Sequence, residues 1–324
     1  MLQRDVYLGS YLEPLAPFLS RADVTDIYVN GPGEVWVEVL GGNPERVEAP
    51  ALTSKVLARL ARQVAALNAQ GISREHPLLS GSLPDGSRIQ IVLPPATRGE
   101  IALAIRRHVS AGLGLQDYHD SGAFARAEHG VTTASGHGQM ETGEGRASMM
   151  ETLRDAVLAR RNILISGGTS TGKTTFLNAL LREVPQSERL ILIEDTAELQ
   201  MSHENAVGLL AARGVLGEAE VSAEDLLVAS LRMRPDRIIL GEMRGREALT
   251  FLRAVNTGHP GSMSTIHADT PERAIDQLAL LVLQAGANMQ WDDVVRYVTR
   301  SLDLIIQLKR ADGARSVDRI WQPK

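Results

Sequence analysis

The first third of the chain alternates apolar and polar positions, which is the pattern of half-buried strands. One such stretch runs from Val24 to Val39 and is interrupted by Gly31-Pro32-Gly33, so it predicts a β-hairpin. Two more stretches lie within residues 89–105 and are separated by a Pro-Pro pair. From Val56 to Leu67 the apolar spacing changes to three and four, which predicts an amphipathic helix. We therefore predict a small α+β domain over residues 1–109.

Between residues 110 and 147 this patterning stops, because glycine recurs and large apolar residues are few. A structureless loop of this length is uncommon inside a compact domain. Domain boundaries fall in exposed segments of this composition. We therefore predict a Gly-rich flexible linker over residues 110–147.

Beyond the predicted linker, short apolar strands alternate with amphipathic helices. Asn162 to Ser166 predicts a strand, Phe176 to Val184 a helix, and Leu190 to Ile193 a second strand. This order is typical of a parallel sheet wound with helices. The fold class is therefore α/β, with a larger domain over residues 148–324. Further strands are predicted at Arg237–Leu240, Ser262–Ile266, Leu302–Leu308 and Ser316–Trp321, the last two as a hairpin.

A glycine-rich loop separates the first of these strands from the helix, and it matches the phosphate-loop pattern G-x-x-x-x-G-K-[ST]. In such a loop the glycines let backbone N–H groups wrap the phosphates, and the helix N-terminus adds partial positive charge. Lys173 is then expected to reach the β- and γ-phosphates, and the Thr174 hydroxyl to ligate Mg²⁺. The sequence therefore predicts Mg–ATP binding by Gly167, Gly168, Thr169, Ser170, Thr171, Gly172, Lys173, Thr174 and Thr175.

Two of the apolar strands are followed by acidic residues. Leu190 to Ile193 leads into Glu194, and Arg237 to Leu240 is followed by Gly241 and Glu242. Ligands of a wound α/β sheet sit at the carboxyl ends of its strands. ATP hydrolysis needs one carboxylate to orient or deprotonate the attacking water and another to hold the water shell of the metal. Glu194 and Glu242 are the candidates, with Glu242 reaching Mg²⁺ through water, and the sequence leaves open which of them is the general base.

Two histidines lie in the segment from Asn256 to Asp269. His259 falls in a Gly/Pro turn, whereas His267 ends a predicted strand. A histidine at a strand end can donate to a γ-phosphate and so report its loss, which makes His267 the candidate. The alternative for each is a structural histidine, and neither spacing nor cysteine supports a zinc site.

Composition limits the classes of protein that remain. At 324 residues, with 44% hydrophobic and 23% charged residues, the chain has the size of two ordinary domains. Its net charge of −5 gives no global attraction to nucleic acid. Cysteine is absent, which fits a reducing compartment. Residues 1–11 lack the apolar centre of a signal peptide and no apolar run is long enough to span a bilayer, so we expect a cytoplasmic protein with at most peripheral membrane contact.

Four motifs together resemble the secretion ATPases of the type II, type IV and conjugative systems. They are the phosphate loop, the acidic box Ile193–Thr196, the Walker B region Leu231–Gly245 and the histidine box that ends at Ala268. The resemblance covers about residues 150–270 and is greatest to the smaller hexameric traffic ATPase of type IV secretion and conjugal DNA transfer. It implies a RecA-like P-loop ATPase domain preceded by the smaller α+β domain.

The N-terminal part resembles the family more loosely, through Asp85–Gln90 and Ile105–Arg107. In the family this domain lies over the nucleotide and supplies arginines to its phosphates, which implies that role for Arg88 and Arg106. The alternation in the second segment places Arg106 on the polar face and Arg107 in phase with the buried residues, so Arg106 is favoured. An arginine over the γ-phosphate would stabilise charge in the transition state. The alternative is a surface arginine that is solvated or paired with an acid.

The resemblance implies a homo-hexameric motor that uses ATP to energise type IV secretion or conjugative transfer and the assembly of its apparatus. Its expected partners are inner-membrane components and other ATPases of the transfer channel, at the cytoplasmic face of the inner membrane, without sequence-specific binding of nucleic acid. The sequence leaves open whether the N-terminal domain completes the nucleotide site of its own subunit or of a neighbour.

Three alternatives stand beside this prediction. The nearest is a pilus extension, pilus retraction or type II secretion motor, although such motors commonly carry a tetracysteine zinc module. A DNA translocase belongs to a different class, and strong stimulation of ATPase activity by single-stranded DNA would favour it. The third is a nucleotide-gated binding module that assembles a channel with negligible turnover.

Overall fold

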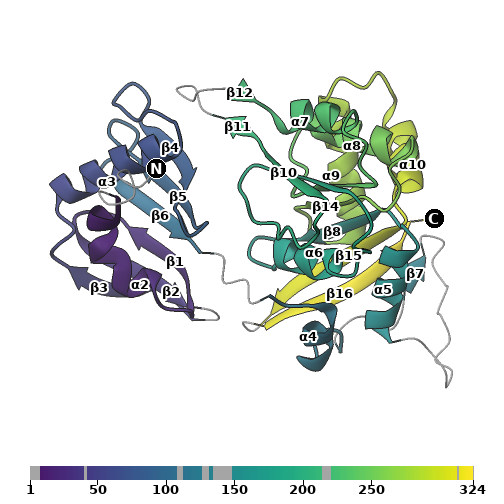
Figure 1. Cartoon of the computed structure of the whole chain (residues 1–324), viewed down its shortest axis with the longest axis horizontal. Helices are drawn as coiled ribbons and strands as arrows, with labels where there is room; N and C mark the ends of the chain where they lie inside the picture. The colour runs from purple at the N-terminus through teal and green to yellow at the C-terminus, as the bar shows by residue number, and fades with distance from the viewer. Residues whose placement is uncertain are drawn as a thin grey trace. The chain divides into compact units, whose positions relative to one another are not determined.

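The computed structural model of the chain describes residues 8–39, 42–107, 112–125, 131–133, 148–213, 220–311 and 314–323. The chain divides into two compact units (Figure 1). The N-terminal unit comprises Met1–Val109 and Ala212–Val221, and the C-terminal unit comprises Ser110–Ala211 and Ser222–Lys324. The domain limit near residue 109 stays a prediction, because residues 108–111 lie outside the described ranges.

The N-terminal unit contains a six-stranded antiparallel sheet in the order β3-β2-β1-β6-β5-β4. The predicted hairpin is formed by β1 and β2, and the predicted amphipathic helix is α3, whose first turn is capped by the Thr53 side chain. Both predictions are therefore confirmed. The strands are β1 (Val24–Val29), β2 (Gly33–Val39), β3 (Glu45–Ala49), β4 (Leu78–Ser82), β5 (Arg88–Val92) and β6 (Ala102–Arg106), and the helical segments are η1 (Glu13–Leu15), α2 (Ala16–Leu19) and α3 (Ser54–Leu67).

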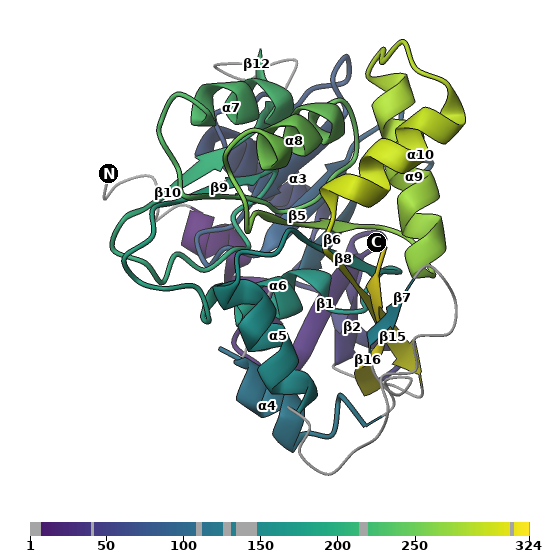
Figure 2. The ribbon, with the colours of Figure 1, turned by 90° about the vertical axis from the view of Figure 1, so that its right-hand side faces the viewer.

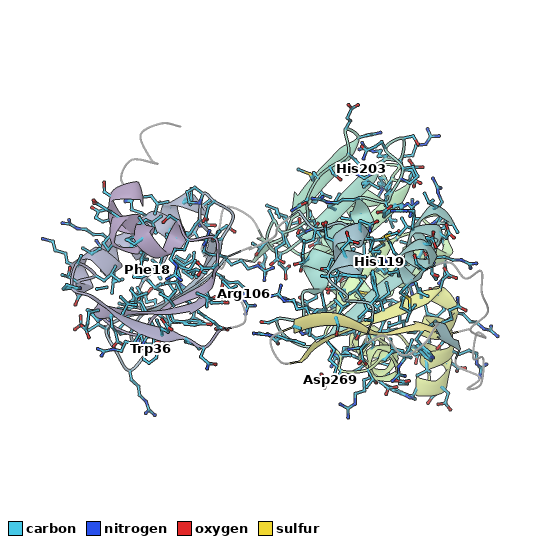
Figure 3. The ribbon with its side chains drawn as sticks, turned by 90° about the horizontal axis from the view of Figure 1, so that it is seen from below. Phe18, Trp36, Arg106, His119, His203 and Asp269 are labelled. Atoms are coloured by element: carbon cyan, nitrogen blue, oxygen red, sulfur yellow. The ribbon has the colours of Figure 1, made fainter. Side chains whose placement is uncertain are left out.

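Alternation divides the side chains of this sheet between two faces. Ile89 and Ile105 are buried and pack in one apolar core with residues of α3. Arg88 and Arg106 are the adjacent residues along the same strands, so they belong to the other face. Figure 3 shows the two sides of the sheet, with Phe18 on the side of α2 and Trp36 on the opposite side.

The C-terminal unit is a helix-wrapped sheet of eight strands in the order β10-β9-β13-β14-β8-β15-β16-β7. Neighbouring strands run parallel except in the β15–β16 hairpin, as the strand–helix alternation predicts. The strands are β7 (Val131–Thr133), β8 (Ile163–Gly167), β9 (Leu190–Glu194), β10 (Ala206–Leu210), β13 (Arg237–Leu240), β14 (Met263–Ile266), β15 (Leu304–Ala311) and β16 (Ala314–Gln322). The helices are α4 (Leu115–Asp120), α5 (Met149–Leu158), α6 (Lys173–Leu181), α7 (Ala223–Ser230), α8 (Glu247–Asn256), α9 (Pro271–Gln284) and α10 (Trp291–Ser301). The short strands β11 (Ala212–Arg213) and β12 (Glu220–Val221) pair with each other and are grouped with the N-terminal unit.

Helices cover both faces of this sheet, so its central strands are buried on both sides (Figure 2). Ile191 and Ile193 of β9 face the core formed with α7, α8, α9 and α10. Leu190 and Leu192 of the same strand face the core formed with α5 and α6. Central strands buried on both faces are continuous apolar runs, which is why no polar residue interrupts β9 before its last residue, Glu194.

Residues 112–125 fall within the linker predicted over 110–147, but they pack against the C-terminal unit. Helix α4 buries Leu115 in the core of the C-terminal unit, and the Tyr118 ring packs edge-on against the Phe176 ring, with centroids 5.0 Å apart. Phe124 packs against the same core. These three apolar side chains anchor a segment whose glycine content alone suggests a flexible chain. The remainder of the predicted linker lies outside the described residues, apart from β7, which pairs with β16.

A buried ion pair fixes the start of β13. The Arg237 guanidinium is fully buried and donates to both carboxylate oxygens of Glu188, at 2.7 and 2.8 Å. It also donates to the Val157 carbonyl at 2.8 Å. The hydrogen bond from Arg237 lowers the pKa of Glu188 below its ordinary value of 4.5. The pair therefore ties α5 and the segment before β9 to the central strand that leads to Glu242.

We expect Glu188→Gln to lower the free energy of unfolding at pH 7 by about 3 kcal/mol, because Arg237 would stay charged and buried without its counter-ion. Urea denaturation followed by tryptophan fluorescence measures the change. The stabilisation by Glu188 is present above its ordinary pKa of 4.5 and is lost as the pH falls through the lowered value in the folded chain. The difference between the two proteins should therefore shrink below that pH.

The matched control is Glu183→Gln. Glu183 accepts from Arg154 at 2.7 Å, but the Arg154 side chain is 40% exposed. The expected loss of stability is under about 1 kcal/mol. Equal losses in the two variants, or a difference that persists in acid, would contradict the assigned role of the buried pair.

Candidate functional site

The phosphate loop connects β8 to α6 in a conformation that only small residues allow. Gly172 has φ +88° and immediately precedes the helix, where a side chain would be strained. At Gly167 a Cβ atom would lie 2.5 Å from the Thr171 hydroxyl oxygen and 3.1 Å from the Leu308 carbonyl oxygen. The backbone is therefore free to close around a ligand at the N-terminus of α6, where helix dipole and free N–H groups favour anions.

Lys173 turns back into this loop. Its side chain is buried, and its ammonium donates to the carbonyls of Gly167 at 3.0 Å and Gly168 at 3.1 Å. The ammonium also lies 3.3 Å from Nδ1 of His267, which follows β14. The loop lysine and the histidine predicted from the strand end thus belong to one site.

Glu242 lies at the same edge of the sheet, two residues beyond β13. One carboxylate oxygen lies 3.0 Å from His267 Nε2, and the other accepts from Arg244 at 2.5 Å. The Glu242 side chain is 18% exposed, so it keeps access to solvent. Lys173, His267 and Glu242 therefore form a continuous chain of contacts from the phosphate loop to the tip of β13.

The surroundings of His267 favour its uncharged form. Burial, followed by the nearby Lys173 ammonium, lowers the pKa of its imidazole below the ordinary 6.5. The Lys173 ammonium lies 3.3 Å from Nδ1 and 3.4 Å from Nε2, whereas Glu242 lies 3.0 Å from Nε2. A carboxylate can only accept, so we assign the ring proton to Nε2, which leaves Nδ1 as the acceptor for Lys173. The imidazole can thus transmit a change at the lysine to the carboxylate.

Glu194 has a different environment from Glu242. It is buried at the end of β9, and its Oε2 accepts from the backbone N–H groups of Glu198 at 2.8 Å and Leu199 at 2.7 Å. These bonds hold the segment that follows the strand. The two predicted acids do end neighbouring strands, since β9 pairs with β13.

His259 lies away from this edge. It follows α8 and precedes β14, and its Nδ1 lies 3.0 Å from the carbonyl of Pro235, which precedes β13. It is therefore at the amino ends of the strands, and its contact is structural.

Two arginines beside the site, Arg244 and Arg315, were not among the residues predicted from the sequence to act in it. Arg244 reaches Glu242, and it also lies 3.4 Å from Asp195, the residue after β9. Arg315 of β16 covers the loop, since a Cβ atom on Gly172 would lie 3.2 Å from Arg315 Cδ. The two-residue spacing of Glu242 and Arg244 in extended chain could have identified Arg244, whereas only the strand order brings Arg315 to the loop.

The predicted arginines of the N-terminal unit are cross-strand neighbours. Arg88 lies opposite Arg106 in the β5–β6 pair, and Asp26 lies opposite Arg106 in the β1–β6 pair. Arg106 donates to Asp26 at 3.1 Å and is 48% exposed. Arg107 instead donates to the carbonyls of Arg21 and Val24 within its own unit. Contact of Arg88 or Arg106 with a nucleotide stays a prediction.

A wound parallel sheet whose strand β8 leads into a lysine-bearing glycine loop, with acids at the tips of β9 and β13, defines a RecA-like P-loop ATPase. The chain belongs to the type II/IV secretion system protein family, whose model matches residues 10–319. The predicted family resemblance is thereby confirmed.

Relatives match nearly the whole chain. The type IV secretion system protein VirB11 of Bartonella quintana is 36% identical over 96% of this chain and 91% of its own length. The type IV secretion system protein PtlH of Bordetella pertussis is 37% identical over 98% and 96%. The crystal structure of the pilus retraction motor PilT with bound ADP is 22% identical over 98% of this chain and 83% of its own, with a TM-score of 0.60, a likeness of fold. Across the described ranges, no helix has the length and apolar character that crossing a membrane requires.

Proposed function

We propose that this chain is the Mg–ATP-driven motor of a type IV secretion or conjugative transfer apparatus. The observation that supports it most is the contact chain Lys173–His267–Glu242, which joins the phosphate loop to two strand tips. The loop fits ATP, because Gly167 leaves no room for a side chain, Gly172 has a positive φ, and α6 presents a helix N-terminus and a buried lysine. Bound Mg²⁺ would neutralise charge on the phosphates, with Thr174 as its protein ligand.

Each acid then has a distinct task. Glu242 is partly exposed and acts on water, either the attacking molecule or one held by Mg²⁺. One carboxylate oxygen of Glu194 accepts hydrogen bonds from two backbone N–H groups, which favours a role in positioning the segment after β9. His267 reports the presence of the γ-phosphate through its contacts with both Lys173 and Glu242.

The N-terminal unit completes the site in this proposal. Arg106, helped by its cross-strand neighbour Arg88, would approach the γ-phosphate and stabilise transition-state charge. Its exposure and its solvent-accessible ion pair with Asp26 leave the guanidinium able to exchange partners. The unit that supplies it belongs either to the same subunit or to a neighbour in a ring.

The ring is proposed to be a homo-hexamer at the cytoplasmic face of the inner membrane, in contact with inner-membrane components and other ATPases of the channel. The names of the relatives, which are type IV secretion system proteins, support the part of this proposal that places the chain in such an apparatus. Conversion of ATP binding into alternate closure of the units would supply mechanical work.

Sedimentation velocity tests the assembly. We expect the Glu242→Gln protein with Mg–ATP to sediment mainly as a hexamer, because bound nucleotide persists when turnover stops. The same protein without nucleotide should contain more of the smaller species. A monomer under both conditions, at the concentration that supports ATPase activity, would contradict the ring.

A further inference from the structure

Arg244 stands on the same side of the chain as Glu242. The segment beyond β13 stays extended, with the Met243 N–H donating to the Thr265 carbonyl at 2.9 Å. Met243 is buried in the core, so its two neighbours along the chain turn to the opposite side. This places the Arg244 guanidinium and the Glu242 carboxylate next to each other at the sheet edge.

The backbone at Arg244 is held by hydrogen bonds to a buried carboxylate. Glu247 of α8 is buried and uses Oε1 to accept from the N–H groups of Arg244 at 2.6 Å and Gly245 at 2.7 Å. The backbone position from which the Arg244 side chain extends is therefore fixed.

From that point Arg244 contacts acids on two neighbouring strands. It donates to Glu242 at 2.5 Å beyond β13 and to Asp195 at 3.4 Å beyond β9. His267 lies against the other oxygen of Glu242. Glu242 is thus held by one donor on each oxygen, and a carboxylate that must orient water needs this kind of fixed geometry.

We propose that Arg244 is a positioning residue, which orients the Glu242 carboxylate and is itself held by Asp195. The inference rests on the proposed action of Glu242 on water. It assigns no contact with the nucleotide to Arg244, so its removal should affect the chemical step and leave ATP binding in place.

Arg244→Gln tests this inference. We expect kcat to fall about 10- to 100-fold, as for other outer-shell partners of a functional group. The KM for ATP and the affinity for a fluorescent ATP analogue should stay within about twofold, since within the described residues the Arg244 guanidinium contacts Glu242 and Asp195. Arg244→Lys keeps the charge and one donor, so its kcat should lie between those of the wild type and Arg244→Gln.

The matched control is Arg246→Gln, an exposed arginine two residues further along the same segment. It should leave kcat unchanged, and thermal unfolding of all variants establishes that they fold. An Arg244→Gln enzyme with wild-type kcat would overturn the inference. So would a loss of ATP affinity that accounts for the whole loss of activity.

A double-mutant cycle with Asp195→Asn tests the link to β9. If Asp195 acts by holding Arg244, Asp195→Asn lowers kcat in the wild-type background and adds little in the Arg244→Gln background. Fully additive effects would reject the link. A different result would contradict the proposed function itself, namely wild-type activity in the Glu242→Gln enzyme.

Discussion

We expect Lys173→Ala to lower kcat for ATP hydrolysis by at least about 100-fold, because removal of a charge-stabilising donor has an effect of this size in other enzymes. The ammonium is held inside the loop by the carbonyls of Gly167 and Gly168, where it can meet the terminal phosphates. Its loss also removes the positive charge next to His267. A phosphate-release assay at saturating Mg–ATP measures the effect.

The fold should survive this substitution. Lys173 contributes polar contacts to a loop rather than apolar area to the core, so the circular dichroism spectrum should match that of the wild type. Lys309→Ala is the matched control, because the Lys309 side chain on β15 is 63% exposed and pairs with Asp318. Wild-type activity in Lys173→Ala, or equal losses in both variants, would contradict the nucleotide site.

Glu242→Gln should lower kcat by about 100- to 10,000-fold, the range for loss of a general base or of the group that orients water. Glutamine has nearly the same shape and keeps an oxygen for the Arg244 donor, but its NH2 group replaces the oxygen that faces His267, so the loss combines the charge of the carboxylate with that contact. Affinity for ATP should be retained, because the loop and Lys173 are unchanged. Single-turnover kinetics and binding of a fluorescent ATP analogue separate the two effects.

Glu204→Gln is the control for that substitution, since Glu204 is an exposed glutamate of the same unit. It should leave turnover unchanged. A wild type no faster than Glu242→Gln would instead identify a nucleotide-gated binding module. Strong stimulation of the wild type by single-stranded DNA, lost steeply with salt, would favour the DNA translocase.

The central sheet could be predicted from the sequence because its strands are short apolar runs between helices. Strand β10 was not predicted, because Gly208 interrupts its short apolar run. Helix α4 was not predicted either, since its anchoring residues lie among glycines. Both elements are defined by what they pack against, which a local pattern does not contain.

The phosphate loop and the histidine could be predicted as one site because motif and strand position agree. The contact between Lys173 and His267 bears out their proximity. The partners of Glu194 and Arg106 could not be predicted. Glu194 accepts from the backbone after its own strand, and Arg106 pairs with Asp26 of the neighbouring strand β1, which is 80 residues away along the chain. Such contacts depend on register and side-chain direction, which appear only when the strands are assembled.

The order of strands in the sheet has a consequence for synthesis on the ribosome. Strand β8, which carries the loop, is bonded on one side by β14 and on the other by β15, up to Leu308. A nascent chain that has emerged only as far as α6 therefore has the whole motif but neither of the strands that hold it. The phosphate loop can therefore reach its folded position only after nearly the whole C-terminal unit has been made.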